Sequence, residues 1–273
     1  MIFMDYDLPQ LEAIAAKNLS EYDNERLAIP KKADAIGFVE LFLNLPFDPQ
    51  MLSPYQELLG LTAFNDGHWY VWPDEFGQCT GSAFLDFAAL FADVKGENRL
   101  LNDMQRYGSP RKHPVKKGTI LVDSRLLDEG ANEGRANFTI LHEAFHWILH
   151  QKVFARQPVI LQRYCDQQGL STFAYKRSMN GIQKTEWQAN AAAAAFLMPK
   201  EAVKNALRQT LKLSRNAHFP IKWTGDVDSA ITETAEMFGA SNAAMRNRAS
   251  NLGFVSDIPF EYRSNRNYNS LPF

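Results

Sequence analysis

Apolar side chains recur at intervals of three and four residues in the middle of the chain. Phe138, Leu141, Phe145 and Ile148 follow this spacing. On an α-helix, residues three and four apart share one face. The pattern therefore predicts an amphipathic helix over residues 134–150.

Several other stretches also have helical patterns. One begins at Glu186, continues through five alanines and ends before Pro199, which cannot extend a helix. In the N-terminal part, apolar spacing predicts helices through residues 11–19 and 33–45. A shorter apolar pattern predicts another helix over residues 84–92.

Strand patterns lie between these helices. Residues 62–64 and 68–72 flank Asn65-Asp66-Gly67, whose Asp-Gly pair is a strong signal for a hairpin turn. A further strand is predicted at residues 119–122, after a polar loop over residues 108–118. We expect these strands to form a small sheet beside the helix at residues 134–150. An exposed edge of that sheet could align an extended substrate by strand addition.

Residues 231–253 have the pattern of a helix-turn-helix, with Gly239 at the turn and Ser241 as the cap of the second helix. Such a unit can enter the major groove of DNA. Arg246 and Arg248 are the only basic side chains on the second helix, which is a weak electrostatic footprint for DNA. Packing or protein recognition is therefore the favoured role of this region.

Within the first predicted helix, residues 142–146 read His-Glu-Ala-Phe-His. The i and i+4 imidazoles of His142 and His146 share one helix face, so both can reach one tetrahedral zinc ion. Glu143 can then reach a water molecule on that ion and act as the catalytic base. The pentad predicts a zinc site that hydrolyses peptide bonds, with two unrelated histidines as the structural alternative.

A catalytic zinc ion needs a third protein ligand and an open fourth position. Glu186 is the best candidate, at the start of the alanine-rich helix, because Asn190 follows it at i+4 on the same face. The Asn190 amide could then support a ligating imidazole by a hydrogen bond. An ordinary surface glutamate is the alternative.

His150 continues the i, i+4 series, but it lies about 12 Å along the helix axis from His142, too far to share one ion. We expect it to support the site, to contact substrate or to be merely a polar residue. Peptide hydrolysis also needs a donor for the oxyanion, beyond the metal itself. The sequence does not rank the candidates for this contact, which are His113, His150, Tyr164, Tyr175 and Arg177.

Two blocks together resemble the ImmA/IrrE metallopeptidase family. The first runs from Glu133 to His150, and the second combines Glu186-Trp187-Gln188-Ala189-Asn190 with Phe196-Leu197-Met198-Pro199. The resemblance is strongest over residues 118–199 and weaker at residues 60–64 and 246–253. In the first block the sequence departs from the family pattern at Phe145, where a glycine is usual. The interval from the pentad to Glu186 also looks longer than in compact members.

The resemblance implies an α+β fold with a zincin-like core, in which a small sheet packs on the helix that carries the pentad. It implies one Zn²⁺ per chain, bound by His142, His146 and Glu186, with Glu143 as general base. Members of this family are associated with cleavage of helix-turn-helix repressors. We therefore expect a protein substrate of that kind.

The composition is that of a folded protein, with 45% hydrophobic residues, 22% charged residues and a net charge of −2. We expect an N-terminal helical segment (1–56), a metallopeptidase domain (57–210) and a C-terminal helical region with a polar tail (211–273). Cys79 and Cys165 are too far apart for a CxxC site and suggest free thiols in a reducing compartment. With no signal peptide pattern and no apolar run of membrane length, the expected location is the cytoplasm.

Two other classes of function remain open at this point. The chain could be a DNA-binding regulator whose zinc domain senses metal or a partner. Direct DNA binding is possible on this hypothesis but not favoured. Alternatively, it could be a protein-interaction module with a purely structural metal site. A fourth ligand such as His150 or Asp166 would favour this last hypothesis, because structural zinc sites are closed.

Overall fold

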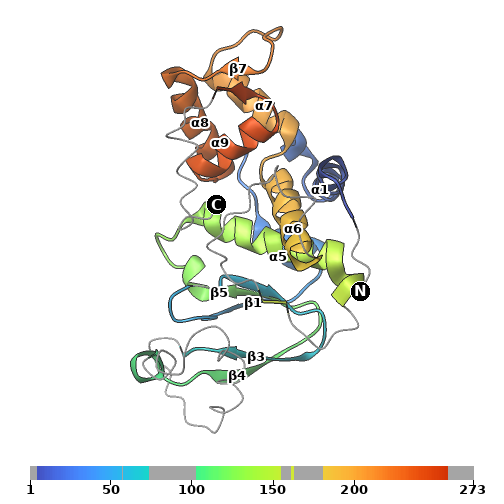
Figure 1. The fold of residues 1–273 in the computed structure, drawn as a ribbon, viewed down its shortest axis with the longest axis vertical. Coiled ribbons are helices and arrows are strands. Elements are labelled where there is room, and N and C mark those ends of the chain that lie inside the picture. Colours follow the sequence, from blue (N-terminus) through green and yellow to red (C-terminus); the bar gives the residue numbers. More distant parts are fainter. Residues whose placement is uncertain (1–4, 57, 74–102, 155–160, 163–180, 258–273) are drawn as a thin grey trace.

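The structure is a computed structural model, which describes residues 5–56, 58–73, 103–154, 161–162 and 181–257. These residues form a mixture of helices and short strands, as expected for the α+β class (Figure 1). The predicted helix at residues 84–92 lies outside the described residues. So do six residues named in the sequence analysis: Cys79, Tyr164, Cys165, Asp166, Tyr175 and Arg177.

The centre of the molecule is a pair of packed helices, α5 (Glu133–Phe154) and α6 (Gly181–Leu197). Both helices were predicted from their patterns, and the structure confirms them. The apolar face of α5 is buried, with Leu141 and Phe145 fully inaccessible to solvent. The alanines of α6 leave little bulk between the two backbones, so the helices can pack closely.

The N-terminal part covers α6. Helix α1 (Leu8–Tyr22) begins with a capping box, in which Asp7 and Gln10 satisfy each other's backbone N–H groups. The 3₁₀-helix η1 (Asn24–Leu27), the short α2 (Ala35–Gly37) and the π-helix η2 (Phe38–Phe42) follow. The helix expected at residues 33–45 is thus present in its middle part, though only Ala35–Gly37 is an α-helix.

The main sheet has four strands in the order β1-β5-β2-β6. Its strands are β1 (Phe47–Gln50), β2 (Gly60–Thr62), β5 (Ile120–Asp123) and β6 (Leu161–Gln162). β1 is parallel to β5, whereas β2 is antiparallel to both of its neighbours. β5 confirms the strand expected at residues 119–122, and α5 packs on β2 and β5, so the sheet lies beside that helix as predicted.

The predicted hairpin around Asp66-Gly67 is wrong. β3 (Gly67–Val71) follows the turn, but it pairs with β4 (Arg111–Val115) in a separate two-stranded sheet. Both edges of β2 are already taken by β5 and β6. The turn is also tied elsewhere, since the Asp66 carboxylate accepts a hydrogen bond of 2.7 Å from the Lys117 backbone N–H.

β4 also corrects the expected loop over residues 108–118. The strand was missed because it contains Pro114 and polar side chains, which are unusual in the centre of a sheet. A two-stranded sheet has only edge strands, so a missing N–H at Pro114 is tolerated there. This segment is rich in basic side chains, and most of them are exposed: Arg111, Lys112, His113, Lys116 and Lys117.

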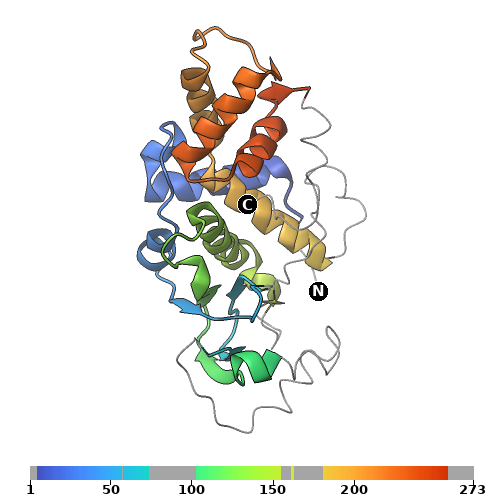
Figure 2. The same cartoon turned by 90° about the vertical axis from the view of Figure 1, so that its left-hand side faces the viewer.

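The C-terminal helices form the end of the molecule opposite β3 and β4 (Figures 1 and 2). They are α7 (Lys200–Thr210), α8 (Gly225–Phe238) and α9 (Asn242–Asn251). Strands β7 (Ile221–Lys222) and β8 (Val255–Ser256) pair beside them. Gly239 ends α8 at φ +63°, and the Ser241 hydroxyl caps α9 by accepting from the Ala244 N–H, as the sequence predicted.

One cluster of buried apolar side chains connects these parts. It includes Leu11 of α1, Phe145 of α5, Leu207 of α7 and Phe238 of α8. Residues from all three of the expected segments therefore share a core, and the division at residues 56 and 210 stays a prediction. Among the described residues, no helix combines the length and the apolar character needed to cross a membrane.

Candidate metal centre

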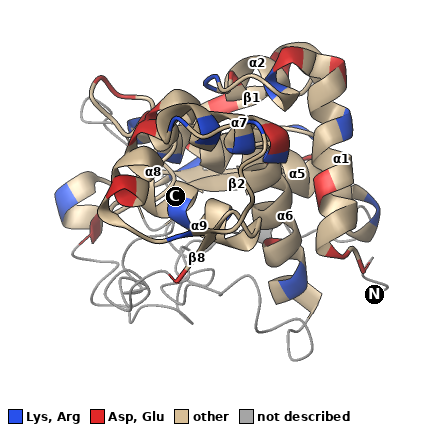
Figure 3. Cartoon of the chain, turned by 90° about the horizontal axis from the view of Figure 1, so that it is seen from above, with Lys and Arg blue, Asp and Glu red and all other residues tan. Residues whose placement is uncertain are grey.

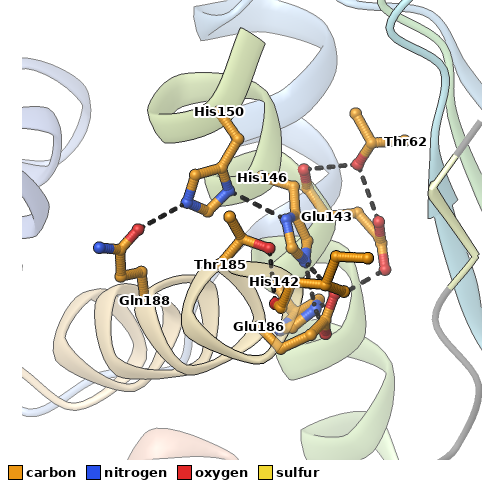
Figure 4. A network of polar contacts seen from close by, with 9 residues as sticks. Thr62, His142, Glu143, His146, His150, Thr185, Glu186 and Gln188 are labelled. Carbon is orange, nitrogen blue, oxygen red and sulfur yellow. Dashed lines mark hydrogen bonds and ion pairs between the residues drawn. The ribbon is translucent and has the colours of Figure 1, made fainter. Parts of the chain in front are cut away.

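Three side chains from two helices converge between α5 and α6 (Figure 4). His142 and His146 come from successive turns of α5, and their Nε2 atoms are 2.9 Å apart. Glu186, from α6, places Oε2 3.3 Å from Nε2 of His142 and Oε1 3.1 Å from Nε2 of His146. The pentad and the third candidate ligand, which are 40 residues apart in the sequence, meet at one point.

The two imidazoles are buried, while the Glu186 side chain keeps 21% of its surface exposed. Burial alone would raise the pKa of the Glu186 carboxyl. The charge of His146 and hydrogen bonds from both imidazoles outweigh that effect and hold the pKa well below its ordinary value. Glu186 is therefore a carboxylate, which is the form that binds a metal ion.

These groups fit a divalent ion of the zinc type. Two donors, each 2.0–2.2 Å from a tetrahedral ion, are about 3.3–3.6 Å from each other. The three separations between candidate ligand atoms, from 2.9 to 3.3 Å, approach this range. Two imidazole nitrogens and one carboxylate are also a donor set that zinc prefers. Among the described residues, His142, His146 and Glu186 are the side chains of ligand type that lie close enough together to hold a metal ion.

His150 lies on the far side of His146 from Glu186. Its Nδ1 atom is 3.0 Å from Nδ1 of His146, and its Nε2 atom is 2.9 Å from the Oε1 atom of Gln188. If Nε2 of His146 is kept free for a metal ion, Nδ1 of His146 carries the proton. This N–H group then donates a hydrogen bond to Nδ1 of His150. His150 then donates from Nε2 to Gln188, so every polar hydrogen in the chain has an acceptor.

The charge state of His150 agrees with this chain. Burial, together with the charge of His146, lowers the pKa of His150 to about 3. His150 is therefore neutral at physiological pH and can accept a hydrogen bond at Nδ1 while donating at Nε2. Because both nitrogens are engaged away from the three converging atoms, His150 is not a fourth ligand in this arrangement. The other suggested fourth ligand, Asp166, lies outside the described residues.

Glu143 lies beside the candidate metal ligands. Its Oε1 atom is 4.0 Å from Nε2 of His142, and its Oε2 atom lies 2.8 Å from the Thr62 hydroxyl on β2. The same hydroxyl is 2.8 Å from the Glu143 backbone oxygen. Gly60 makes room for this contact, because a Cβ atom there would lie 2.8 Å from Cγ of Glu143.

Phe145 explains how the departure from the usual pentad is accommodated. Its ring is fully buried and packs against Phe196 and Phe38, with ring centroids 5.9 and 6.3 Å away. These contacts belong to the core on the opposite side of α5 from β2. The large side chain at position 145 therefore contributes to packing without entering the space between Glu143 and Glu186.

Two other sequence candidates lie away from the converging atoms or lack the expected contact. His113 is on β4, where its Nε2 atom is 2.6 Å from the Asp48 carboxylate. Asn190 lies one turn after Glu186, but its side-chain oxygen has no hydrogen-bond partner among the described residues. The amide that contacts a histidine belongs to Gln188, and a supporting role for Asn190 stays a prediction.

The two arginines of the predicted DNA-reading helix contact the protein itself. Arg246 forms an ion pair of 2.5 Å with Asp228 and lies over the Trp223 ring. Arg248 forms an ion pair with Glu12 of α1 and donates to the backbone oxygen of Met198. The side chains of both arginines are at least 85% buried. In this conformation they brace α9 against its neighbours, which further weakens the electrostatic case for DNA recognition.

Sequence reasoning did not find Thr62 or Gln188 as parts of the site. A signal existed for both, because Thr62 lies in the weaker stretch of family resemblance at residues 60–64, and Gln188 lies in the Glu186-Trp187-Gln188 block. Their roles depend on contacts between residues 81 and 38 positions apart, respectively. Periodicity within one helix or strand does not reveal such contacts.

A helix with a His-Glu-x-x-His pentad, packed so that a glutamate of the next helix meets both histidines, defines the class of metal-dependent peptidases. The family model described as IrrE N-terminal-like domain (Peptidase_M78) matches residues 109–250, more than half of the chain. The chain belongs to this metallopeptidase family. Comparisons with curated proteins and with solved structures find no significant match.

Proposed function

We propose that the chain is a zinc-dependent endopeptidase with a zincin-like core. In this proposal one zinc ion per chain is held by His142, His146 and Glu186, and Glu143 is the general base. The observation that carries the proposal is the convergence of three ligand-type atoms from α5 and α6, next to a carboxylate fixed by β2. Its position in a family of metallopeptidases gives independent support.

Each protein group has a defined part in peptide hydrolysis. A bound zinc ion would supply a Lewis acid, which polarises the scissile carbonyl and makes a water molecule more acidic. Glu143 accepts a proton from the attacking water as its oxygen bonds to the carbonyl carbon. The same carboxyl then gives that proton to the leaving amine nitrogen as the C–N bond breaks. His142, His146 and Glu186 stay in place throughout.

Thr62 contributes orientation. Its hydroxyl hydrogen can be donated to the Glu143 carboxylate, which leaves the other carboxylate oxygen, Oε1, on the side of His142. Holding the base in this way reduces the number of orientations that must be lost before proton transfer. His150 and Gln188 do the same for the ring of His146, because their hydrogen bonds fix its tautomer.

The proposed substrate is a protein, specifically a helix-turn-helix transcriptional repressor. This part of the proposal is supported by the family resemblance, in which such repressors are cleaved. The activity would then take place in the cytoplasm, where the repressor meets DNA, and cleavage would regulate transcription. His113, Tyr164 and Tyr175 remain candidates for contacts with the substrate or the transition state.

The test compares the wild type with Glu143→Gln on a panel of purified helix-turn-helix repressors and on unfolded casein, with products identified by mass spectrometry. We expect the wild type to cleave at defined peptide bonds in a repressor. Glu143→Gln should keep its zinc and its melting temperature yet lose cleavage by about 100-fold or more, as expected for removal of a general base.

The matched control is Glu129→Gln, which makes the same chemical change at an exposed residue outside the metal centre. This control should cleave like the wild type. Equal activity of Glu143→Gln and wild type would contradict the assignment of the base. Absence of any cleavage by the zinc-loaded wild type across the panel would contradict the proposed substrate.

A further inference from the structure

A hollow lies at the C-terminal end of the molecule and uses none of the residues of the metal centre. Its volume is about 360 Å³, and its wall is formed by α7 together with the segments before β7 and before β8. Lys200, Lys204 and Arg208 contribute from α7, and His218 and Phe219 from the segment before β7. Figure 3 views this end of the molecule and shows basic segments along α7.

The charged side chains that line this hollow are all basic. Lys200, Lys204 and Arg208 are spaced four residues apart, so they share one face of α7. No aspartate or glutamate is among the residues that line the hollow. Among the described residues, the one ion pair of these three cations is a contact of 3.5 Å between Lys204 and Glu201, whose side chain is 57% exposed. Like charges at this spacing repel one another and destabilise a helix. Because acidic side chains do not line the hollow, the positive charge of this row is uncompensated there.

Arg208 is the last of these three cations along α7, and an aromatic ring holds its side chain in place. Its guanidinium carbon lies 5.6 Å from the centre of the Phe219 ring. Phe219 in turn packs on Phe254, with the ring centroids 4.9 Å apart. The Nε–H group of Arg208 is buried and has no hydrogen-bond partner among the described residues. A buried donor of this kind is costly unless a ligand supplies an acceptor.

We propose that this hollow binds the phosphoryl groups of a small anionic ligand of nucleotide size. Phosphoryl oxygens are acceptors that carry negative charge, and arginine and lysine side chains bind them through charge-assisted hydrogen bonds. A volume of about 360 Å³ is at the lower end of the range for small-molecule sites. The aromatic rings of Phe219 and Phe254 give the hollow an apolar wall beside the cations.

A small ligand is favoured over the phosphates of duplex DNA. The basic groups line a concave surface, and the arginines of α9 are occupied by Asp228 and Glu12. A DNA-binding face would need basic side chains spread over a broader surface, so that several phosphates are contacted at once. The three cations that line this hollow instead form one row on a single face of α7.

The experiment is calorimetric titration of the zinc-loaded protein with inorganic pyrophosphate at about 0.15 M ionic strength, where weak surface attraction is screened. The test variant is Lys200→Gln/Lys204→Gln, which removes two cations from the hollow. The control is Lys116→Gln/Lys117→Gln, which removes the same charge near the opposite end of the molecule. Both variants retain the metal centre, so binding of pyrophosphate to zinc would appear equally in both.

We expect saturable binding to the wild type and to the control, and an increase in Kd of about tenfold or more in the test variant. Arg208→Lys, which keeps the charge but loses the forked donor geometry, should also weaken binding. The inference is overturned if the wild type shows no saturable binding up to about 1 mM pyrophosphate. It is equally overturned if both double variants lose affinity alike, or if a duplex oligonucleotide binds more tightly than pyrophosphate and depends on the same lysines.

Discussion

Replacement of His150 tests whether a chain of hydrogen bonds supports the metal centre. His150→Leu removes both the acceptor for Nδ1–H of His146 and the donor to Gln188, while filling a similar volume. The tautomer of His146 that leaves Nε2 free is then no longer favoured. Loss of such a supporting partner typically weakens metal binding by about 10–100-fold, or about 1.4–2.7 kcal/mol.

A conservative variant separates support from packing. In His150→Asn, the amide oxygen can take the place of Nδ1 and accept from His146. This variant should therefore recover most of the zinc affinity that His150→Leu loses, although it lacks a group that reaches Gln188. Replacement of the exposed His68 by Leu removes a histidine that is not part of the metal centre and should leave zinc affinity unchanged.

The assay is competition for zinc against a chromophoric chelator, with circular dichroism to show that each variant is folded. Equal zinc affinity in His150→Leu and wild type would refute the idea that His150 supports His146. Equal losses in His150→Leu and His150→Asn would mean that the volume and shape of the ring matter, rather than the hydrogen bond. This assay needs no knowledge of the peptide substrate.

Three further outcomes follow from the same geometry. Thr62→Val should keep zinc but lower kcat in the cleavage assay by about 10–100-fold, because it lacks the hydroxyl that orients Glu143. Thr62→Ser keeps the hydroxyl and should be close to wild type. An unchanged kcat in Thr62→Val would contradict this role. Gly60→Ala should lower the free energy of unfolding, measured in urea titrations, by about 1–3 kcal/mol. The added Cβ would lie 2.8 Å from Cγ of Glu143 and 2.9 Å from Cγ2 of Thr139. A variant as stable as the wild type would show that these side chains move aside without cost. Acid should destabilise the metal-free protein as pH falls from about 6.5 towards 3, because His150 binds a proton in the unfolded chain but not in the folded one. The free energy of unfolding should fall by at most about 1.4 kcal/mol per pH unit from this group. His150→Asn should lack this contribution, and identical slopes of wild type and variant in urea titrations across pH would contradict it.

The helices could be predicted from the sequence because their signals are local. Leu141 and Phe145 show the buried face of α5, and Pro199 marks the end of α6. Gly239 and Ser241 likewise define the turn between α8 and α9 by their own backbone and capping preferences. Each of these features needs only a few neighbouring residues to be stable.

The pairing of strands could not be predicted in the same way. Asp66-Gly67 does make a turn, but β2 pairs with β5 and β6, and the carboxylate of Asp66 binds the backbone of Lys117. These competing partners lie about 50 residues or more further along the chain, so a local turn signal gives no information about them. β4 was missed for a related reason, since Pro114 is compatible with a strand only where the sheet has an open edge.

The candidate site shows the same division. His142, Glu143 and His146 follow from one helical turn, and Glu186 follows from the need for a third ligand. Thr62 and the bond between His150 and Gln188 become visible only when β2 and α6 are packed on α5. Local signals in a sequence thus identify the reacting groups more readily than the side chains that hold them in position.

His142, His146 and Glu186 are proposed to form one zinc site. The most direct measurement is elemental analysis of protein purified without added metal, comparing wild type, Glu186→Ala and the exposed control Glu129→Ala. We expect about one zinc per chain in the wild type and in the control, and almost none in Glu186→Ala. Full zinc content in Glu186→Ala would contradict the third ligand, and zinc absent from the wild type would contradict the site as a whole.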